Sequence, residues 1–144
     1  VQEDSLRISW KKGHESQFYW QADVPADFSQ MEQDGGALVM EFMINKHPRG
    51  SVTQRMDCGW PCRGEIDVTE FYKSIPLRQR SKVGISLSCF KKMGVDMEKI
   101  TSPLVLVSKD EFEITFSDVR VIANASEDNT IQLCDSGVAT LLQD

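Results

Sequence analysis

Two cysteines near the middle of the chain, Cys58 and Cys62, enclose the residues Gly-Trp-Pro and are the first candidates for chemistry. We call residues 58–62 the cysteine loop. As metal ligands these cysteines would need two more partners, drawn from Cys89, Cys134, His14 and His47. Zinc ligands usually come in paired knuckles of fixed spacing, and here there is one loose pair. A thioredoxin-type redox pair would need C-x-x-C at the start of a helix in a βαβ context, which the sequence lacks. We therefore expect no metal and no redox pair.

A disulfide between the two cysteines of the loop fits the local sequence better. Gly59 and Pro61 favour a tight turn, which can bring the two Cα atoms within the roughly 4.4 to 6.8 Å that a disulfide tolerates. Because so short a loop constrains the unfolded chain little, its value would be local rigidity. Four cysteines in an acidic chain also favour an oxidising compartment, the periplasm or the exterior. The pairing of Cys89 and Cys134 stays open.

Three carboxylates, Asp57, Glu65 and Asp67, lie close to the cysteine loop in the sequence. Hydrolysis of a glycosidic bond would need two of them held roughly 5 to 10 Å apart across a cleft, and abundance alone does not make such a pair. Their simpler interpretation is as solvated charges at strand edges and in loops. The sequence also lacks the serine elbow, H-E-x-x-H, phosphate-loop and G-x-G-x-x-G patterns. The common small catalytic signatures are therefore missing.

The elements that must position these residues are short. Apolar and polar residues alternate over brief runs between turn residues, and long stripes of helical period are scarce, which predicts an all-β chain. In one such run a single face carries four apolar residues, Leu38, Met40, Phe42 and Ile44. Other runs cover residues 6–10, 51–56, 82–88, 103–108 and 111–122. We expect a two-sheet antiparallel β-sandwich with a jelly-roll connection.

The last of these runs, 111–122, contains a change of register. Its apolar residues alternate as far as Phe116 and then resume at Val119, a shift of one residue at Ser117 and Asp118. A β-bulge at this point would keep both sets of apolar residues on the inside.

Two segments could form one or two short helices. The segment 68–75 could be capped by Thr69, its second residue, or by Asp67, which precedes it, and the segment 89–100 contains Gly94, which would end a single turn. Neither segment is long enough to build a helical layer, so the sheets would form the main structure.

Length and charge limit the domain organisation and the partners. We expect 144 residues to form one domain, with a core from about 6 to 122 and a C-terminal extension over 123–144. A net charge of −6 argues against nucleic acid as a partner, and no apolar run approaches the roughly 20 residues that span a membrane. The first residues lack the basic and apolar regions of a signal peptide, so we expect a signal to have been removed or to lie upstream in a longer protein.

Several motifs occur in an order that resembles one known family. They are "GALVMEF", "HPRGSVTQRMDCGWPCRGEIDVTEF", "VGISLSCFKKMGVDMEKITSPLVLVS" and "EFEITFSDVRV". Together they resemble the C-terminal galactose-binding-like (ExoP-type) domain of bacterial exo-acting glucan glucosidases of glycoside hydrolase family 3. The resemblance extends from about residue 6 to about residue 122. The pair Trp60-Pro61 departs from the family pattern, in which smaller polar residues are commoner between the cysteines.

The resemblance implies a galactose-binding-like jelly roll that follows the catalytic domains of a 1,4-β-glucan or mixed 1,3/1,4-β-glucan glucosidase. Those upstream domains would carry the catalytic residues, so this chain alone would not be an enzyme. It would be periplasmic or secreted by a bacterium and would need no cofactor. Loop carboxylates and carbonyls can hold structural calcium in such sandwiches, but no loop has the required density of Asp residues, and we place no ligands.

Two functions are compatible with this resemblance. In the first, the sandwich packs on the catalytic domains and lends a loop to the substrate cleft. In the second, it is an autonomous module that binds β-glucan or gluco-oligosaccharides through aromatic rings and nearby polar groups. The candidate contacts are Trp60 with Asp57, Arg63 and Glu65, and a second patch of Gln17, Tyr19 and Trp20. Trp60 could instead be a plug beneath its own loop, and core positions are favoured for Trp10 and Trp20.

Overall fold

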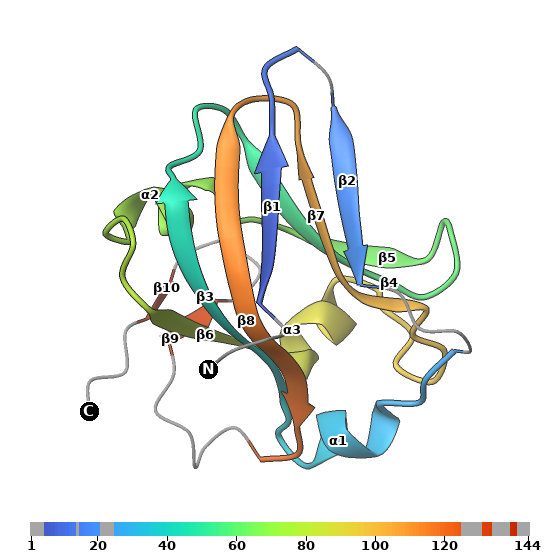
Figure 1. Ribbon diagram of the computed structural model, residues 1–144. Helices are drawn as coiled ribbons and strands as arrows, with labels where there is room; N and C mark the ends of the chain where they lie inside the picture. Colours follow the sequence, from blue (N-terminus) through green and yellow to red (C-terminus); the bar gives the residue numbers. More distant parts are fainter. Residues whose placement is uncertain (1–4, 14, 21–24, 125–130, 134–138, 141–144) are drawn as a thin grey trace.

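The structure is a computed structural model that describes residues 5–13, 15–20, 25–124, 131–133 and 139–140. Over these residues the chain forms ten strands and three short helices (Figure 1). The strands are β1 (Leu6–Trp10), β2 (Ser16–Trp20), β3 (Ala37–Lys46), β4 (Val52–Asp57), β5 (Arg63–Asp67), β6 (Ser81–Ser86), β7 (Ser102–Ser108), β8 (Phe112–Ile122), β9 (Ile131–Leu133) and β10 (Ala139–Thr140). The helices are α1 (Ser29–Gln33), α2 (Thr69–Ser74) and α3 (Leu87–Lys92).

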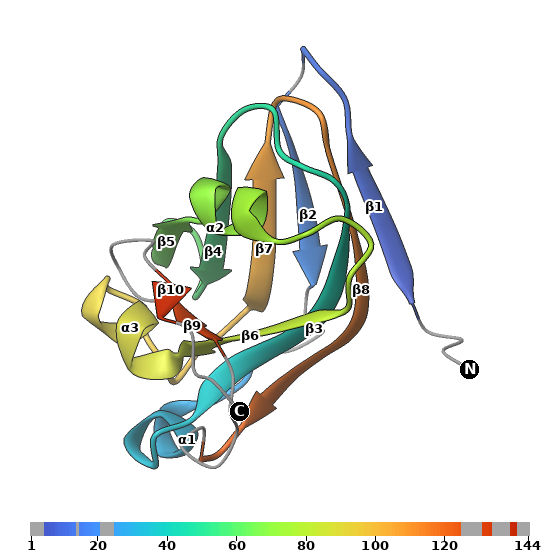
Figure 2. The same cartoon turned by 90° about the vertical axis from the view of Figure 1, so that its left-hand side faces the viewer.

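The strands form two facing sheets, which confirms the predicted β-sandwich. The six-stranded sheet has the order β1-β8-β3-β6-β9-β10, and the four-stranded sheet has the order β2-β7-β4-β5. Neighbouring strands are antiparallel except β6 and β9, which pair in parallel. Figure 2 shows β4 and β7 in one layer and β3 and β8 in the other. From β1 to β4, and again from β5 to β8, consecutive strands alternate between the two sheets, as a jelly-roll connection requires.

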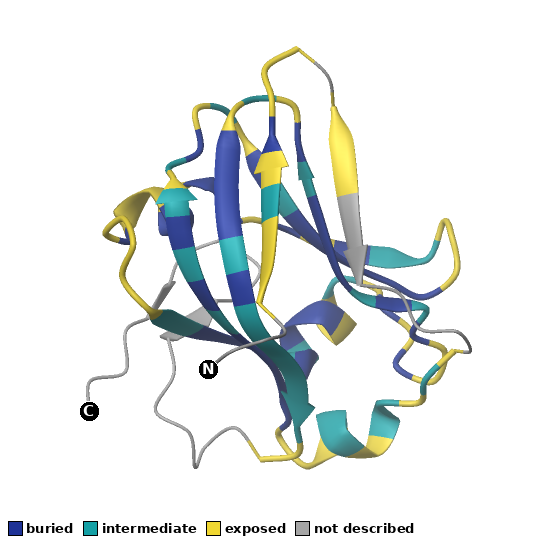
Figure 3. Ribbon diagram, in the orientation of Figure 1, coloured by how far each residue is buried: buried dark blue, intermediate teal, exposed yellow. Residues whose placement is uncertain are grey.

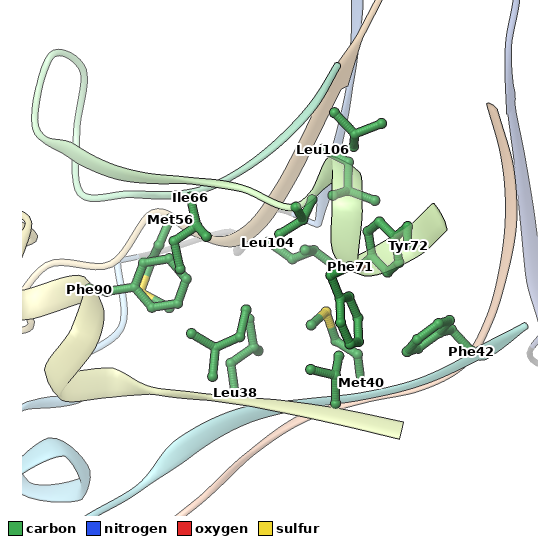
Figure 4. Close-up of a cluster of buried hydrophobic side chains, with 14 of the residues drawn as sticks. Leu38, Met40, Phe42, Met56, Ile66, Phe71, Tyr72, Phe90, Leu104 and Leu106 are labelled. Atoms are coloured by element: carbon green, nitrogen blue, oxygen red, sulfur yellow. The ribbon is translucent and has the colours of Figure 1, made fainter. Parts of the chain in front are cut away.

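The core between the sheets is rich in aromatic rings. The predicted inward face of β3 is buried at all four positions, Leu38, Met40, Phe42 and Ile44. Tyr72 of α2 is fully buried, with its ring centroid 5.4 Å from that of Phe42 and 5.5 Å from that of Phe112. Figure 4 shows part of this cluster, with Leu104 and Leu106 of β7 opposite the side chains of β3. The alternation of β3 therefore positions one wall of the core.

The predicted bulge in the last long strand is present. Glu41 of β3 pairs with Asp118 of β8, and the next residue of β3, Phe42, pairs with Phe116. Ser117 is therefore the extra residue of β8. The shift lets apolar residues on both sides of the bulge contact the core, as the sequence pattern required.

Both predicted helices form, and a third was missed. The Asp67 carboxylate accepts a hydrogen bond of 2.9 Å from the N–H of Thr69 at the start of α2. The predicted strand 82–88 is too long, because Ser86 caps α3 and Leu87 is the first residue of that helix. Gly94 follows α3 with φ +109°, in keeping with its predicted role at the end of the turn. Helix α1 was not predicted, since its single turn is too short to display a helical period.

The tryptophans occupy different environments. Trp10 is 5% exposed and stacks on Phe112, with the ring centroids 5.3 Å apart, so its predicted core position is confirmed. Trp20 lies in β2, and its side chain is outside the described part of the structure. Among the described residues, none of the helices has the length and apolar character needed to cross a bilayer.

Candidate functional site

The cysteine loop joins β4 to β5 and is closed by the predicted disulfide. The Cα atoms of Cys58 and Cys62 lie 5.0 Å apart. Within the loop, the Cys58 N–H donates to the Cys62 carbonyl at 2.9 Å, and the Cys62 N–H donates to the Gly59 carbonyl at 2.8 Å. Gly59 adopts φ +92°, a conformation that side chains disfavour. Because Cys58 is fully buried in the core, the base of the loop is anchored to the sandwich.

Trp60 projects from this loop with 67% of its surface exposed. Figure 3 shows the connection between β4 and β5 as an exposed segment at the edge of the molecule. The interpretation of Trp60 as a plug beneath its own loop is therefore wrong. The short loop is closed by its disulfide and by two internal backbone hydrogen bonds, which leave no interior for an indole. The ring instead offers a large apolar surface to a ligand or a partner.

A buried ion pair lies beside the ring, between Arg55 and Asp57 of β4. Arg55 Nε donates to Asp57 Oδ1 at 2.6 Å, and Arg55 Nη2 donates to Asp57 Oδ2 at 3.2 Å. The two side chains are only 6% and 12% exposed. The interpretation of Asp57 as a solvated charge is thus wrong, because a bidentate arginine compensates its burial.

Arg55 is the central residue that sequence reasoning missed. Its guanidinium carbon lies 5.2 Å from the centroid of the Trp60 ring, within the range of a cation–π contact. A signal for it was present in the sequence. Arg55 stands two residues before Asp57, and residues two apart in a strand point to the same face.

Gln17 of β2 belongs to the same group as Trp60. Its Oε1 accepts a hydrogen bond of 3.3 Å from Arg55 Nη2, so that Arg55 contacts Gln17, Asp57 and Trp60 together. The Gln17 amide also carries an NH₂ group, which is a hydrogen-bond donor. One residue of the second predicted patch, Gln17, therefore lies with the Trp60 patch. Tyr19 and Trp20 of the second patch lie in β2, where their backbones pair with Val105 and Leu104, and their side chains are outside the described part of the structure.

Arg63 is a second arginine in contact with the Trp60 ring. Its guanidinium carbon lies 4.4 Å from the Trp60 ring centroid. Arg63 Nε donates to Glu65 Oε2 at 3.3 Å, and Nη1 donates to the Pro61 carbonyl at 2.9 Å. Arg63 and Glu65 are predicted site residues, and the structure brings both to the Trp60 loop. Their ion pair is partly exposed, so it contributes little to folding stability.

Four of these side chains, Gln17, Arg55, Asp57 and Trp60, line an open hollow of about 310 Å³. We call it the tryptophan hollow. It combines one exposed apolar ring with an amide, a guanidinium and a carboxylate whose charges compensate each other. Such a surface can stack on an apolar ring face and exchange hydrogen bonds with hydroxyl groups. Among the described residues, no group of three or more His, Cys, Asp or Glu side chains is arranged to hold a metal ion.

The remaining cysteines are only partly described. Cys89 in α3 is disulfide-bonded and nearly fully buried. Cys134 lies outside the described residues, so the pairing of these two cysteines stays open.

Comparison with known proteins identifies the family and the fold of the chain. The family model of the ExoP C-terminal domain, described as galactose-binding domain-like, matches residues 1–121. The extra C-terminal domain of the exo-1,3/1,4-β-glucanase of a Pseudoalteromonas species has a similar structure, with a TM-score of 0.73 and 20% identity over 91% of this chain and 69% of that one. In the structure of the glucanase itself the corresponding values are 0.74 and 21%, over 92% of this chain and 15% of that one.

A carbohydrate-binding module has a similar fold. The family 30 module of a cellulosomal cellulase of Clostridium thermocellum matches with a TM-score of 0.61 and 21% identity, over 82% of this chain and 73% of that one. No curated protein sequence matches the chain significantly. At these identities the structural matches establish the fold.

Proposed function

Because this chain belongs to the family of ExoP-type C-terminal, galactose-binding-like domains, we propose that it packs on the catalytic domains of a β-glucan glucosidase and presents the tryptophan hollow to the substrate at the rim of their cleft. The domain is not itself catalytic, in line with the extra domain of the glucanase that it resembles. The upstream catalytic domains and a 1,4-linked or mixed 1,3/1,4-linked β-glucan are the partners in this proposal. The disulfides favour a periplasmic or secreted bacterial protein.

The observation that carries the proposal is the exposure of Trp60 on a rigid base. The indole is 67% exposed and so presents a large apolar surface, and it is held by two arginines and a closed loop. Sugars have apolar ring faces that stack on aromatic rings and hydroxyls that bind charged and amide groups. The tryptophan hollow offers both kinds of contact within one small surface.

The experiment compares Trp60→Ala with the wild type in the glucosidase that carries this domain. We expect KM for cellohexaose to rise about tenfold, because loss of one stacking contact of about 1.4 kcal/mol weakens binding by that factor. The kinetics on an aryl β-glucoside, which occupies only the inner end of the cleft, should not change. Leu77→Ala is the matched control, since Leu77 is another exposed apolar residue, remote from Trp60 in sequence. Unchanged KM for cellohexaose would count against the proposal.

A second candidate function, an autonomous carbohydrate-binding module, is favoured by one observation. The polar groups of the tryptophan hollow are already held in place beside the exposed ring by contacts within this chain, from Arg55 to Asp57, Gln17 and Trp60. The similar fold of the family 30 module agrees with this function. Calorimetric titration of the isolated chain with gluco-oligosaccharides separates the two functions. Saturable heat that disappears in Trp60→Ala supports the autonomous module, and no binding at millimolar sugar supports action only beside the catalytic domains.

A further inference from the structure

A second hollow adjoins the tryptophan hollow on the other side of Arg63. It has a volume of about 440 Å³ and is lined by Arg63, Gly64, Glu65 and Met93. We call it the edge hollow, because β5 is the outer strand of the four-stranded sheet. Met93, which directly follows α3, is partly buried against the core.

Arg63 lines the edge hollow and contacts Trp60 of the tryptophan hollow. Its guanidinium carbon lies 4.4 Å from the Trp60 ring centroid, and its Nε donates to Glu65 in the edge hollow at 3.3 Å. The strand pairing also links the two hollows, because Glu65 of β5 pairs directly with Arg55 of β4. Residues paired across neighbouring strands point to the same face of the sheet. Arg63 and Glu65 therefore continue the face of the sheet that carries the tryptophan hollow, and the edge hollow extends from them around the edge strand β5 to Met93.

Gly64 forms the floor of the edge hollow and brings β5 close to Met93. A Cβ atom at Gly64 would lie 2.8 Å from Val95 Cγ2 and 3.2 Å from Met93 Cβ. Only glycine therefore allows this close approach without displacement of its neighbours. The approach places an apolar thioether side chain beside the ion pair of Arg63 and Glu65.

The two hollows repeat the same chemical composition. The tryptophan hollow has an apolar ring beside the Arg55–Asp57 pair, and the edge hollow has an apolar thioether beside the Arg63–Glu65 pair. In each hollow the two charges compensate each other, which suits a neutral ligand. A repeated site of this kind fits a ligand made of repeated units, each with an apolar face and hydroxyls.

We infer that the two hollows are successive subsites for a single β-linked gluco-oligosaccharide that passes over Arg63. This inference rests on the proposed contact of Trp60 with glucan and extends it to the edge of the sheet. Glu65 accepts hydrogen bonds from hydroxyls of the outer sugar unit, and Met93 packs against its apolar face. The two residues thereby determine how strongly affinity grows with the length of the oligosaccharide.

The test is calorimetric titration of the chain with cellobiose, cellotetraose and cellohexaose. Wild-type affinity should rise with length. Glu65→Gln and Met93→Ala should each weaken cellohexaose binding about fivefold and leave cellobiose binding unchanged, because only the longer ligand reaches the edge hollow. Glu70→Gln is the control for Glu65→Gln, since the Glu70 side chain is 86% exposed and lies on α2. If Met93→Ala unfolds the chain, the inference is tested by the cellohexaose and cellobiose affinities of Glu65→Gln alone.

The possible outcomes separate this inference from the proposed function. Equal affinity for all three ligands, or equal losses at every length, would overturn the inference. In that case a loss of all binding in Trp60→Ala would leave the proposed contact of Trp60 with sugar in place. Unchanged sugar affinity in the Glu65 and Met93 variants would also overturn the inference. If none of the three ligands binds, neither hollow is a sugar site of the isolated chain, and the inference is overturned.

Discussion

Arg55 binds the Asp57 carboxylate through two hydrogen bonds, 2.6 and 3.2 Å long, in a pair that is almost fully withdrawn from solvent. The same guanidinium donates to Gln17 and lies under the exposed ring of Trp60. One side chain therefore fixes three residues of the tryptophan hollow. The charge pair makes the site rigid before any ligand binds, which lowers the entropy cost of binding.

Removal of the Arg55 charge should destabilise the fold more than removal of the whole pair. Arg55→Met leaves Asp57 buried without compensation and should lower the free energy of unfolding by about 3 kcal/mol. The double variant Arg55→Met/Asp57→Leu should recover most of this loss but not the affinity for cellohexaose. Denaturant unfolding and calorimetry measure the two effects, with the exposed Arg80→Met as the control. A double variant as unstable as the single one would contradict this description of the pair.

Opening of the cysteine loop should weaken sugar binding while the chain stays folded. The loop closed by the disulfide spans a sequence separation of 4, so loop entropy predicts a loss of about 2 kcal/mol in Cys58→Ala/Cys62→Ala. Trp60 would lose its rigid support, and we expect sugar binding to fall at least tenfold while the chain stays folded. Thermal unfolding and titration of the same sample test this. Retained affinity in the folded variant would show that the disulfide does not position the ring.

Tyr72→Phe should leave the protein at least as stable as the wild type. The Tyr72 hydroxyl is buried without a hydrogen-bond partner among the described residues, and burial raises the pKa of this phenol well above its ordinary value. Because an unsatisfied buried hydroxyl is unfavourable, its removal should raise the free energy of unfolding by up to about 1 kcal/mol. Urea denaturation measures the change. A loss of stability would reveal a partner for the hydroxyl.

Glu113 should contribute to the acid sensitivity of the fold. Hydrogen bonds from Arg7 Nε at 2.6 Å and from Ser9 Oγ at 2.9 Å hold the pKa of Glu113 below its ordinary value. A carboxyl with a lowered folded-state pKa stabilises the protein fully above its unfolded pKa of about 4.3. This contribution is lost as the pH falls through the folded-state pKa. Glu113→Gln should therefore be less stable than the wild type at pH 7, and the two should converge in acid. A constant difference across the pH range would contradict this assignment.

The fold was largely predictable because its elements follow local patterns. Alternation located β3 and its buried face, and the break at Ser117 located the bulge, since both depend on residues adjacent in sequence. Helix α1 and the end of β6 were not predicted, because a helix of about one turn is too short to display the periodic pattern of apolar residues that identifies a helix.

The candidate site was predictable only in part. The disulfide could be predicted from the cysteine spacing, and Trp60 could be selected from its place between the cysteines. The joining of Gln17 to the Trp60 group depends on the order of strands, with β7 between β2 and β4. Contacts between strands distant in sequence leave no local signal, so the contact of Arg55 with Gln17 emerged only from the structure.

The most direct test of the central claim follows the indole N–H signals of the tryptophans by NMR during titration with cellohexaose. A spectrum of Trp60→Phe assigns the Trp60 signal. We expect a saturable shift of that signal, while the signal of Trp10, whose Nε1 donates to the Ser16 carbonyl at 3.0 Å, stays in place. A Trp60 signal that does not move at millimolar sugar, either in the isolated chain or in the glucosidase that carries this domain, would contradict the claim that this ring contacts glucan.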